Sequence, residues 1–301
     1  MKLIIDETKS QGDPYVIKAN GAYYMYATHE NGVQLYKSWD KYTWDFLGFC
    51  FQKDGEKEFW APSVLEINGR YYLYYSSMSV SAIDAHDERL CVAVSDFPEG
   101  PFTFIRELAQ PFSIDPHVVE SDGELFMFYS INDYEAERAG TLIVVDKMKS
   151  PTEMCGQPKI VLRATLDEEI FMKDRFKKGQ HWHTLEGAFY FRKDDYHYLM
   201  YSGNCYESEY YYIGYAVCCS KEKDLTKLTF LKYPDEKTYS PLICKNDKEE
   251  GTGHNSLLED NGKYYVFYHA RDWGKACDID VRTARICEIL PKKELLLAIN
   301  R

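Results

Sequence analysis

Apolar and polar positions alternate along most of this chain in short runs, and the runs come in pairs joined by a turn. Residues 116–130 read PHVVESDGELFMFYS, which is an apolar run, a Ser-Asp-Gly turn and an aromatic run. Asp-Gly or Asn-Gly between two alternating apolar runs is a strong short-range signal for a β-hairpin. The pattern therefore predicts two antiparallel strands here, with side chains pointing alternately to opposite faces.

The same unit recurs along the whole chain. Its five copies are PYVIKANGAYYMYAT (14–28), PSVLEINGRYYLYYSS (62–77), PHVVESDGELFMFYS (116–130), GAFYFRKDDYHYLMYSG (187–203) and NSLLEDNGKYYVFYHA (255–270). Each copy is followed by further strand-like text, such as ERLCVAVS at 88–95. Each unit thus supplies three or four strands, at a spacing of about 50–70 residues.

This long, regular repeat predicts an all-β fold, a five-bladed β-propeller, in which small antiparallel sheets are arranged around an axis. A β-sandwich built from five hairpins is the alternative. Because no Pro/Gly/Ser-rich linker interrupts the chain, we expect residues 1–301 to form a single catalytic domain. Short helical turns are expected near residues 84–89 and 147–154.

Composition narrows the range of partners. The formal net charge of −12 argues against nucleic acid or an anionic membrane surface and is compatible with a neutral or cationic small ligand. No window approaches 18 consecutive apolar residues, so no membrane-spanning helix is expected. The 26 tyrosines lie mostly in the short runs, as expected for residues that favour pleated sheet.

The cysteines and the first residues bear on the compartment. Nine cysteines are scattered without a Cys-x-x-Cys pair, which differs from a secreted disulfide framework. The opening MKLIIDETKSQGD has no extended apolar segment and no small-residue cleavage site. We therefore expect a cytoplasmic protein.

Charged residues mark the points where the chain enters the repeats. The entry points carry Asp13, Trp60-Ala61, Asp115, Glu186 and His254. In a propeller the first strand of each blade is innermost, so its start can line one mouth of the central channel. Alone, an Asp-Pro pair is a common strand entry and Glu186 could be a solvated loop acid. Their recurrence at the same place in the repeat predicts that the three carboxylates converge on one pocket.

Two or three carboxylates around a sugar-sized pocket are what glycoside hydrolysis requires. One acid must be protonated to assist the departing oxygen, and another must be ionised to activate water on the opposite face of the ring. A third negative group near the acid would raise the pKa of that acid by repulsion. Trp60 and Tyr15 would supply stacking surfaces for sugar rings.

At these positions the chain resembles glycoside hydrolase family 43, the five-bladed propeller enzymes that cleave arabinofuranosides and xylosides. The matching segments are GDPYVI around Asp13, EFWAPSV (58–64), FSIDPHVV (112–119), HTLEGAFYF (183–191) and GTGHNSLL (251–258). The resemblance implies an inverting enzyme with Asp13 as general base and Glu186 as general acid. It implies that Asp115 tunes the pKa of the acid and orients the sugar.

The resemblance has further implications for the site. His254 matches a histidine near the axis that contacts the acid cluster or a bound structural calcium, and the chemistry itself requires no cofactor. Arg282 in DVRTARI is similar to the family's active-site arginine, and Arg285 is its rival. The chain has Glu-Gly-Ala where many relatives have Glu-Gly-Pro, and it lacks the C-terminal β-sandwich of the larger xylosidases, which argues against pure β-xylosidase specificity.

Two questions stay open from the sequence. His181-Trp182-His183 could begin a metal site with Glu186, or His183 could line the pocket wall. The leading functional hypothesis is the removal of terminal α-L-arabinofuranosyl or β-D-xylosyl units from arabinoxylo-oligosaccharides. The alternatives are a non-catalytic carbohydrate-binding propeller and a related five-bladed fructosidase or glycoside phosphorylase.

Overall fold

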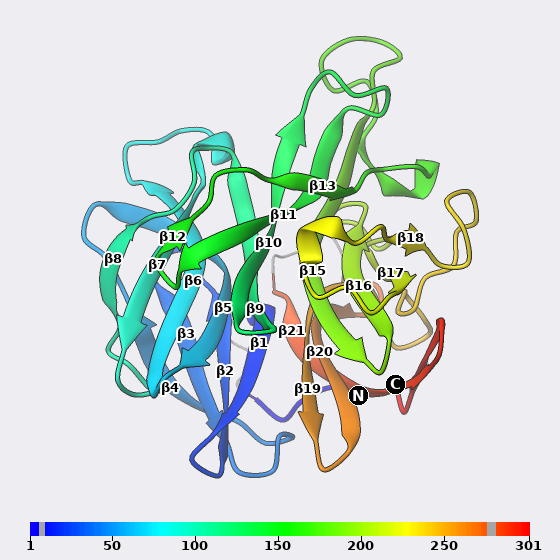
Figure 1. Cartoon of the computed structure of the whole chain (residues 1–301). Coiled ribbons are helices and arrows are strands. Elements are labelled where there is room, and N and C mark those ends of the chain that lie inside the picture. The colour runs from blue at the N-terminus through cyan, green and yellow to red at the C-terminus, as the bar shows by residue number, and fades with distance from the viewer. Residues whose placement is uncertain (6–9, 276–280) are drawn as a thin grey trace.

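The computed structural model describes residues 1–5, 10–275 and 281–301 and consists almost entirely of antiparallel β-sheet in five blades (Figure 1). Three blades form separate four-stranded sheets. Blade 1 holds β1 (Gly12–Ala19), β2 (Ala22–Thr28), β3 (Val33–Ser38) and β4 (Asp45–Phe51). Blade 2 holds β5 (Glu56–Ile67), β6 (Arg70–Ser79), β7 (Arg89–Ser95) and β8 (Thr103–Glu107). Blade 5 holds β19 (Glu249–Asp260), β20 (Lys263–Asp272), β21 (Thr283–Lys292) and β22 (Leu295–Ile299).

Blades 3 and 4 are joined into one larger sheet. Blade 3 holds β9 (Ser113–Ser121), β10 (Glu124–Asp133) and β11 (Gly140–Ser150), with β12 (Glu153–Met154) and β13 (Lys159–Leu162) beside β11. Blade 4 holds β15 (Trp182–Lys193), β16 (Tyr196–Gly203), β17 (Tyr212–Cys219) and β18 (Leu231–Lys232), with β14 (Ile170–Met172) beside β15. A short parallel ladder pairs Gly140 with His183 and Thr141 with Thr184. This ladder brings the two blades into contact beside the axis.

The predicted propeller and its five hairpins are confirmed. Four of the hairpin turns place both central residues at positive φ, as a two-residue type I′ turn requires: Asn20-Gly21, Asn68-Gly69, Asp122-Gly123 and Asn261-Gly262. The helical turn expected near 84–89 is present as the 3₁₀ turn η1 (Ala85–Asp87). The helix expected near 147–154 is wrong, because these residues continue β11 and turn into β12.

Two further 3₁₀ turns, η2 (Asp167–Glu169) and η3 (Leu225–Lys227), are the other helical segments among the described residues. None of the helical segments described is long and apolar enough to cross a bilayer.

The hydrophobic core is divided into five clusters, one between each pair of neighbouring blades. Tyrosines are prominent in it, and several are fully buried, including Tyr24, Tyr26, Tyr74 and Tyr268. A buried tyrosine needs a partner for its hydroxyl. Tyr26 donates to Pro98 O at 2.6 Å, for example, and Tyr268 donates to Glu249 Oε1 at 2.8 Å.

Every innermost strand carries a β-bulge at the same point. The residues at the bulge have left-handed backbone angles: Asp13 (φ 55°), Ala61 (φ 46°), Asp115 (φ 59°), Gly187 (φ 62°) and His254 (φ 46°). Bulges redirect side chains next to active sites. The left-handed conformation costs about 1–2 kcal/mol for a residue with a β-carbon, so neighbouring contacts must hold it in place.

Glu186 differs here from the sequence-based prediction. The residue equivalent to Asp13 and Asp115 is Gly187, and Glu186 lies one position earlier, where it pairs with Ser202 across the hairpin. Gly12 occupies that earlier position in blade 1, where it pairs with Thr28. The three acids therefore come from two adjacent positions of the repeat and not from one.

Hydrogen bonds between blades hold these left-handed residues. The backbone N–H of Ala61 donates to Thr28 Oγ1 at 2.8 Å, and that of His254 donates to Ser202 Oγ at 2.7 Å. The N–H of Gly187 donates to Asp115 Oδ2 at 2.9 Å. In each case the acceptor belongs to the preceding blade.

The ring is closed in two ways where blade 5 meets blade 1. The N–H of Asp13 donates to His269 Nδ1 at 3.1 Å, which continues the series from blade to blade. The first residues of the chain also lie between the two blades, since Ile286 N donates to Met1 O at 2.8 Å and Ile4 N donates to Tyr42 O at 2.9 Å. Both chain ends lie beside blade 5 (Figure 1).

Replacing Gly140 by alanine tests the contact between blades 3 and 4. A β-carbon at Gly140 would lie 2.0 Å from His183 O, which is backbone and cannot move aside. We expect Gly140→Ala to lower the free energy of unfolding by about 3 kcal/mol, measured by urea denaturation. The control is Gly69→Ala, at φ 77° with no atom within 4 Å of the added carbon, where only backbone strain of about 1 kcal/mol applies. Equal losses in the two variants would contradict the close approach.

Candidate active site

A cavity of about 580 Å³ collects most of the predicted site residues. Its walls include the three carboxylates, together with Trp60, His254 and Arg282. These residues come from blades 1 to 5, so the cavity lies where the inner strands meet. Positions far apart in the sequence thus share one chamber of a size suited to a short saccharide.

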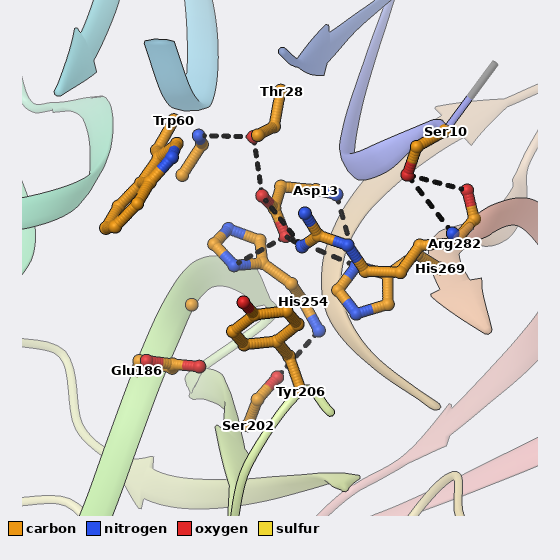
Figure 2. Close-up of polar contacts among 12 residues, drawn as sticks. Ser10, Asp13, Thr28, Trp60, Glu186, Ser202, Tyr206, His254, His269 and Arg282 are labelled. Carbon is orange, nitrogen blue, oxygen red and sulfur yellow. Dashed lines mark hydrogen bonds and ion pairs between the residues drawn. The ribbon is translucent and has the colours of Figure 1, made fainter. Parts of the chain in front are cut away.

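Asp13 is the most strongly held of the three acids. Thr28 Oγ1 donates to Asp13 Oδ2 at 2.5 Å, and Arg282 Nη1 lies 3.3 Å from Oδ1. His254 Nδ1 lies 3.4 Å from the same Oδ1. Figure 2 shows His254, His269 and Arg282 gathered around Asp13 while Glu186 stands apart from them.

These contacts decide the charge of Asp13. Burial alone would raise the pKa of the carboxyl, but the charge of Arg282, with the rings of His254 and His269 beside it, outweighs burial and holds the pKa well below its usual range. Burial lowers the pKa of His269 to about 4, so its ring is neutral at physiological pH. Since Nδ1 of His269 accepts the N–H of Asp13, this ring orients the backbone, and Arg282 is the permanent counter-charge.

Glu186 lies in a different environment. Burial raises the pKa of its carboxyl to about 7, and the charge of Asp13 acts in the same direction. The hydroxyl of Tyr211 donates to Glu186 Oε1 at 2.7 Å and Arg282 lies nearby, both of which favour the ionised form and limit the rise. Near neutral pH, Glu186 therefore holds a proton that it can release.

Asp115 is buried close to Glu186. Burial raises the pKa of Asp115 well above its usual range, and the charges of Glu186 and Asp13 raise it further. The N–H of Gly187 opposes this by donating to Asp115 Oδ2. Because two neighbouring buried carboxylates repel each other, the pair retains a proton at a pH where isolated carboxyls would be ionised.

Two glycines make room for the side chains that touch these acids. A β-carbon at Gly12 would lie 2.6 Å from Arg282 Cζ, and one at Gly253 would lie 1.8 Å from Tyr211 Cε1. Gly12 and Gly253 occupy the same repeat position as Glu186 in their own blades. Glycine at this position therefore lets Arg282 and Tyr211 lie across the strand.

The choice between the two arginines is settled by placement. Arg282 lies against Asp13, and its guanidinium stacks 4.7 Å from the centre of the Tyr206 ring. Arg285 lies within β21, three residues after Arg282, and is buried, where its Nη2 lies 2.6 Å from Asp272 Oδ1. Arg285 does not line the cavity.

Tyr15 does not line the cavity, although it follows Asp13 closely. Its ring packs against His117 and Phe189 beneath the carboxylates, with centroid distances of 6.0 and 5.9 Å. The hydroxyl of Tyr15 lies 3.4 Å from His117 Nδ1. The space left there is only about 10 Å³, about that of one water. These side chains close the channel, so the catalytic cavity is a blind pocket and Tyr15 is part of its base.

His183 also lies outside the cavity, because side chains alternate along β15. Trp182, Thr184 and Glu186 line the cavity, and His183 points to the other face of the strand. There it is buried, with Nε2 accepting from Arg138 Nη1 at 3.1 Å and Nδ1 donating to Ala139 O at 3.2 Å. The same alternation keeps His183 away from Glu186, which removes the metal site considered for the His-Trp-His segment.

The surroundings of His254 do not fit a calcium ion held directly by the protein. Calcium takes six to eight oxygen ligands, whereas His254 presents a nitrogen to a carboxylate already neutralised by Arg282. Across residues 1–5, 10–275 and 281–301, no three His, Cys, Asp or Glu side chains form a metal-binding group.

Several contacts in the site were not predicted by any sequence motif. Thr28 is the last residue of β2, His269 lies near the end of β20, and Tyr211 directly precedes β17 after a loop. The polar residue that closes each aromatic run was the available signal for the first two. Tyr211 sits in a run of three tyrosines, and nothing in that run distinguishes it.

The axial pocket of this propeller holds one carboxyl as an anion and keeps another protonated. An acid/base glycoside hydrolase requires this pair of groups. The chain belongs to glycosyl hydrolases family 43, whose family model matches residues 8–289. It is a glycoside hydrolase of that family.

Two relatives and one solved structure are similar to this chain over most of its length. The chain is 24% identical to xylosidase/arabinosidase 43A of Humicola insolens over 342 aligned positions, covering 94% of each protein. It is 25% identical to the extracellular exo-α-(1→5)-L-arabinofuranosidase ArbA of Cellvibrio japonicus, over 86% of this chain and 78% of that protein. The crystal structure of a thermostable family-43 glycoside hydrolase superposes with a TM-score of 0.82 at 28% identity, covering 97% and 93% of the two chains.

Replacing Tyr211 by phenylalanine tests the control of the acid. The Tyr211 hydroxyl stabilises the ionised form of Glu186 and so lowers the pKa of Glu186. Its removal should raise that pKa, so the fall of kcat/KM at alkaline pH should move upward by about one pH unit. The measurement is the pH profile of kcat/KM on a nitrophenyl glycoside.

Tyr210→Phe is the matched control for this shift. Tyr210 is the adjacent tyrosine in the chain, its side chain is largely exposed, and it does not line the catalytic cavity. Its alkaline limb should coincide with that of the unmodified enzyme. An unchanged or lowered limb in Tyr211→Phe would contradict the assignment of Glu186 as the titrating acid.

Proposed function

We propose that this glycoside hydrolase is an exo-acting, inverting enzyme that removes terminal α-L-arabinofuranosyl or β-D-xylosyl units from arabinoxylo-oligosaccharides. The observation that carries the proposal is the opposite electrostatic setting of Asp13 and Glu186 within one cavity. The printed names of the two relatives described above, a xylosidase/arabinosidase and an exo-arabinofuranosidase, support the choice of pentosides.

Asp13 is proposed as the general base. Its carboxylate stays ionised beside Arg282, so it can accept a proton from a water molecule as the water oxygen bonds to the anomeric carbon. Glu186 is proposed as the general acid. Its proton passes to the glycosidic oxygen as the bond from that oxygen to the anomeric carbon breaks, and the leaving sugar departs as a neutral alcohol. Proton exchange with solvent restores both groups.

Asp115 is proposed to act through Glu186. Because the two carboxyls are close and buried, a charge on either one favours the protonated form of the other. The bond from Gly187 N holds Asp115 Oδ2 in place, which leaves Oδ1 to face the bound sugar as a hydrogen-bond partner. Asp115 thereby helps to keep Glu186 protonated and to orient the terminal sugar unit.

The shape of the cavity supports release of a terminal unit. The base formed by Tyr15, His117 and Phe189 stops a chain from threading through the axis. Trp60 lines the same cavity, and its Nε1 donates to Glu58 Oε2 at 2.9 Å, which fixes the indole plane as a surface for a sugar face.

The compartment is a proposal as well. The eight cysteines that the structure describes are free thiols, and Cys277 lies outside the described residues. Free thiols support a reducing compartment such as the cytoplasm. ArbA, in contrast, is named as an extracellular protein.

Substituting Glu186 by glutamine tests the role of the acid. An aryl glycoside with a good leaving group needs little protonation, whereas a natural linkage needs the proton. We expect Glu186→Gln to lower kcat/KM by about 10²–10⁴-fold on arabinoxylo-oligosaccharides and by about tenfold or less on nitrophenyl pentosides. Steady-state kinetics on both substrates, with NMR of the first-formed anomer, gives the answer.

Glu30→Gln serves as the matched control, because Glu30 is another acid on the cavity wall. Its effect should be small and equal on the two substrate types. Equal losses on both substrates in Glu186→Gln would remove Glu186 from the acid role. Turnover that requires phosphate would establish the phosphorylase alternative, and binding without turnover of any glycoside would establish the carbohydrate-binding alternative.

A further inference from the structure

A second, more open cavity of about 870 Å³ adjoins the catalytic cavity. Phe171, Cys205 and Glu207 line both cavities. The two spaces therefore adjoin at these side chains, beside the loop at 204–210. We call the second one the outer groove, which is lined further by Ser208, Tyr210 and Trp273.

The outer groove begins on the side of the proposed acid. Cys205 and Glu207 stand on the shared wall, and Tyr211, which ends the same loop, donates its hydroxyl to Glu186. A general acid protonates the oxygen of the leaving group, so the leaving group lies on the side of Glu186. The rest of a bound oligosaccharide therefore extends toward the outer groove.

Two large aromatic side chains are exposed in this groove. Tyr210 is 57% exposed and Trp273 is 52% exposed. They come from different segments, the loop before β17 and the residue that follows β20. Aromatic rings with an open face are the side chains that pack against the apolar face of a sugar ring.

Both rings share one cation. Lys245 Nζ lies 3.9 Å from the centre of the Tyr210 ring and 5.8 Å from that of Trp273. Glu209 Oε2 holds the same Nζ at 2.5 Å. Cation–π contacts of this kind orient the two rings before any ligand arrives, and less conformational entropy is lost on binding.

The backbone under the rings is fixed too. Trp273 N donates to Lys248 O at 3.0 Å, and Tyr210 N donates to Ser208 Oγ at 3.1 Å. The buried Arg271 donates from Nη1 to Tyr206 O at 2.5 Å, which ties the loop to blade 5. The outer groove is thus a built surface held by hydrogen bonds.

The polar lining indicates which sugars fit. Asp167, Glu207, Glu209 and Glu250 all line the outer groove, and Lys173 is the basic side chain among its lining residues. Carboxylates accept hydrogen bonds from sugar hydroxyls but repel a uronate. A neutral chain is therefore favoured over an acidic one.

We propose that the outer groove binds the neutral pentose units on the leaving-group side of the scissile bond, with Tyr210 and Trp273 as stacking surfaces. The inference rests on the proposed function, since it assumes that the terminal unit occupies the cavity with Glu186. It assigns to this enzyme a preference for oligosaccharides over short glycosides, and it places that preference outside the catalytic pocket.

The test is the double variant Tyr210→Ala/Trp273→Ala, assayed on a nitrophenyl pentoside and on linear neutral pentose oligosaccharides of five units. We expect kcat/KM on the oligosaccharide to fall about tenfold or more, mainly through KM, while that on the nitrophenyl pentoside stays within about twofold. Trp39→Ala is the matched control, because Trp39 is 70% exposed and lies on blade 1 away from both cavities. It should change neither substrate.

Calorimetric titration of Glu186→Gln with the same pentaose separates this inference from the proposed function. If adding the two alanine substitutions weakens binding of the pentaose about tenfold or more, the result supports binding in the outer groove. A failure to hydrolyse any pentoside would count against the proposed function and not against the outer groove. Equal losses of kcat/KM on short and long substrates, or no loss on either, would contradict sugar binding in the outer groove. Tighter binding of a uronate-bearing oligosaccharide than of the neutral one would overturn its proposed ligand.

Discussion

The structure depends on one recurring interaction, the hydrogen bond between a left-handed residue at the start of an inner strand and a side chain of the preceding blade. Asp13, Ala61, Gly187 and His254 all donate their backbone N–H in this way. The bond holds a backbone conformation that is otherwise costly and turns the entry residues toward the axis. It also links the blades around the ring, so that the fold and the site share the same contacts.

Placement on this ring separates the carboxyls chemically. Asp13 lies where blades 5 and 1 meet, within reach of Arg282 and of two histidines, and stays an anion. Asp115 and Glu186 lie on blades 3 and 4, where each is buried beside the other and burial outweighs the influence of Arg282 on Glu186. The same residue types thus acquire opposite protonation states from the elements around them. That division is what an inverting hydrolysis demands of its two acids.

Much of this could be predicted from the sequence, because hairpins of period two with Asn-Gly turns recur five times, and the entry acids stand out against them. The offset of Glu186 was missed, although the distance to the hairpin turn records it. Asp13 and Asp115 lie seven residues before Asn20 and Asp122, and the residue seven before Asp194 is Gly187. His183 points away from the pocket because side chains alternate along its strand. Arg282 and Arg285 can be told apart only once blade 5 packs against blade 1, which brings Arg282 to Asp13 and leaves Arg285 on Asp272. The ring of Tyr211 in blade 4 packs against Gly253 in blade 5, and no local sequence pattern predicts this contact.

The most direct test of this account is infrared difference spectroscopy of the carboxyl groups in the unliganded enzyme at mildly acidic pH. A protonated buried carboxyl gives a C=O stretch that an ionised one lacks. We predict that Asp13→Asn leaves such a band in place and that Glu186→Gln weakens it, with the remainder coming from Asp115 and from Glu88, whose pKa burial raises to about 9. A band that weakens in Asp13→Asn and persists unchanged in Glu186→Gln would contradict the assignment of anion and acid.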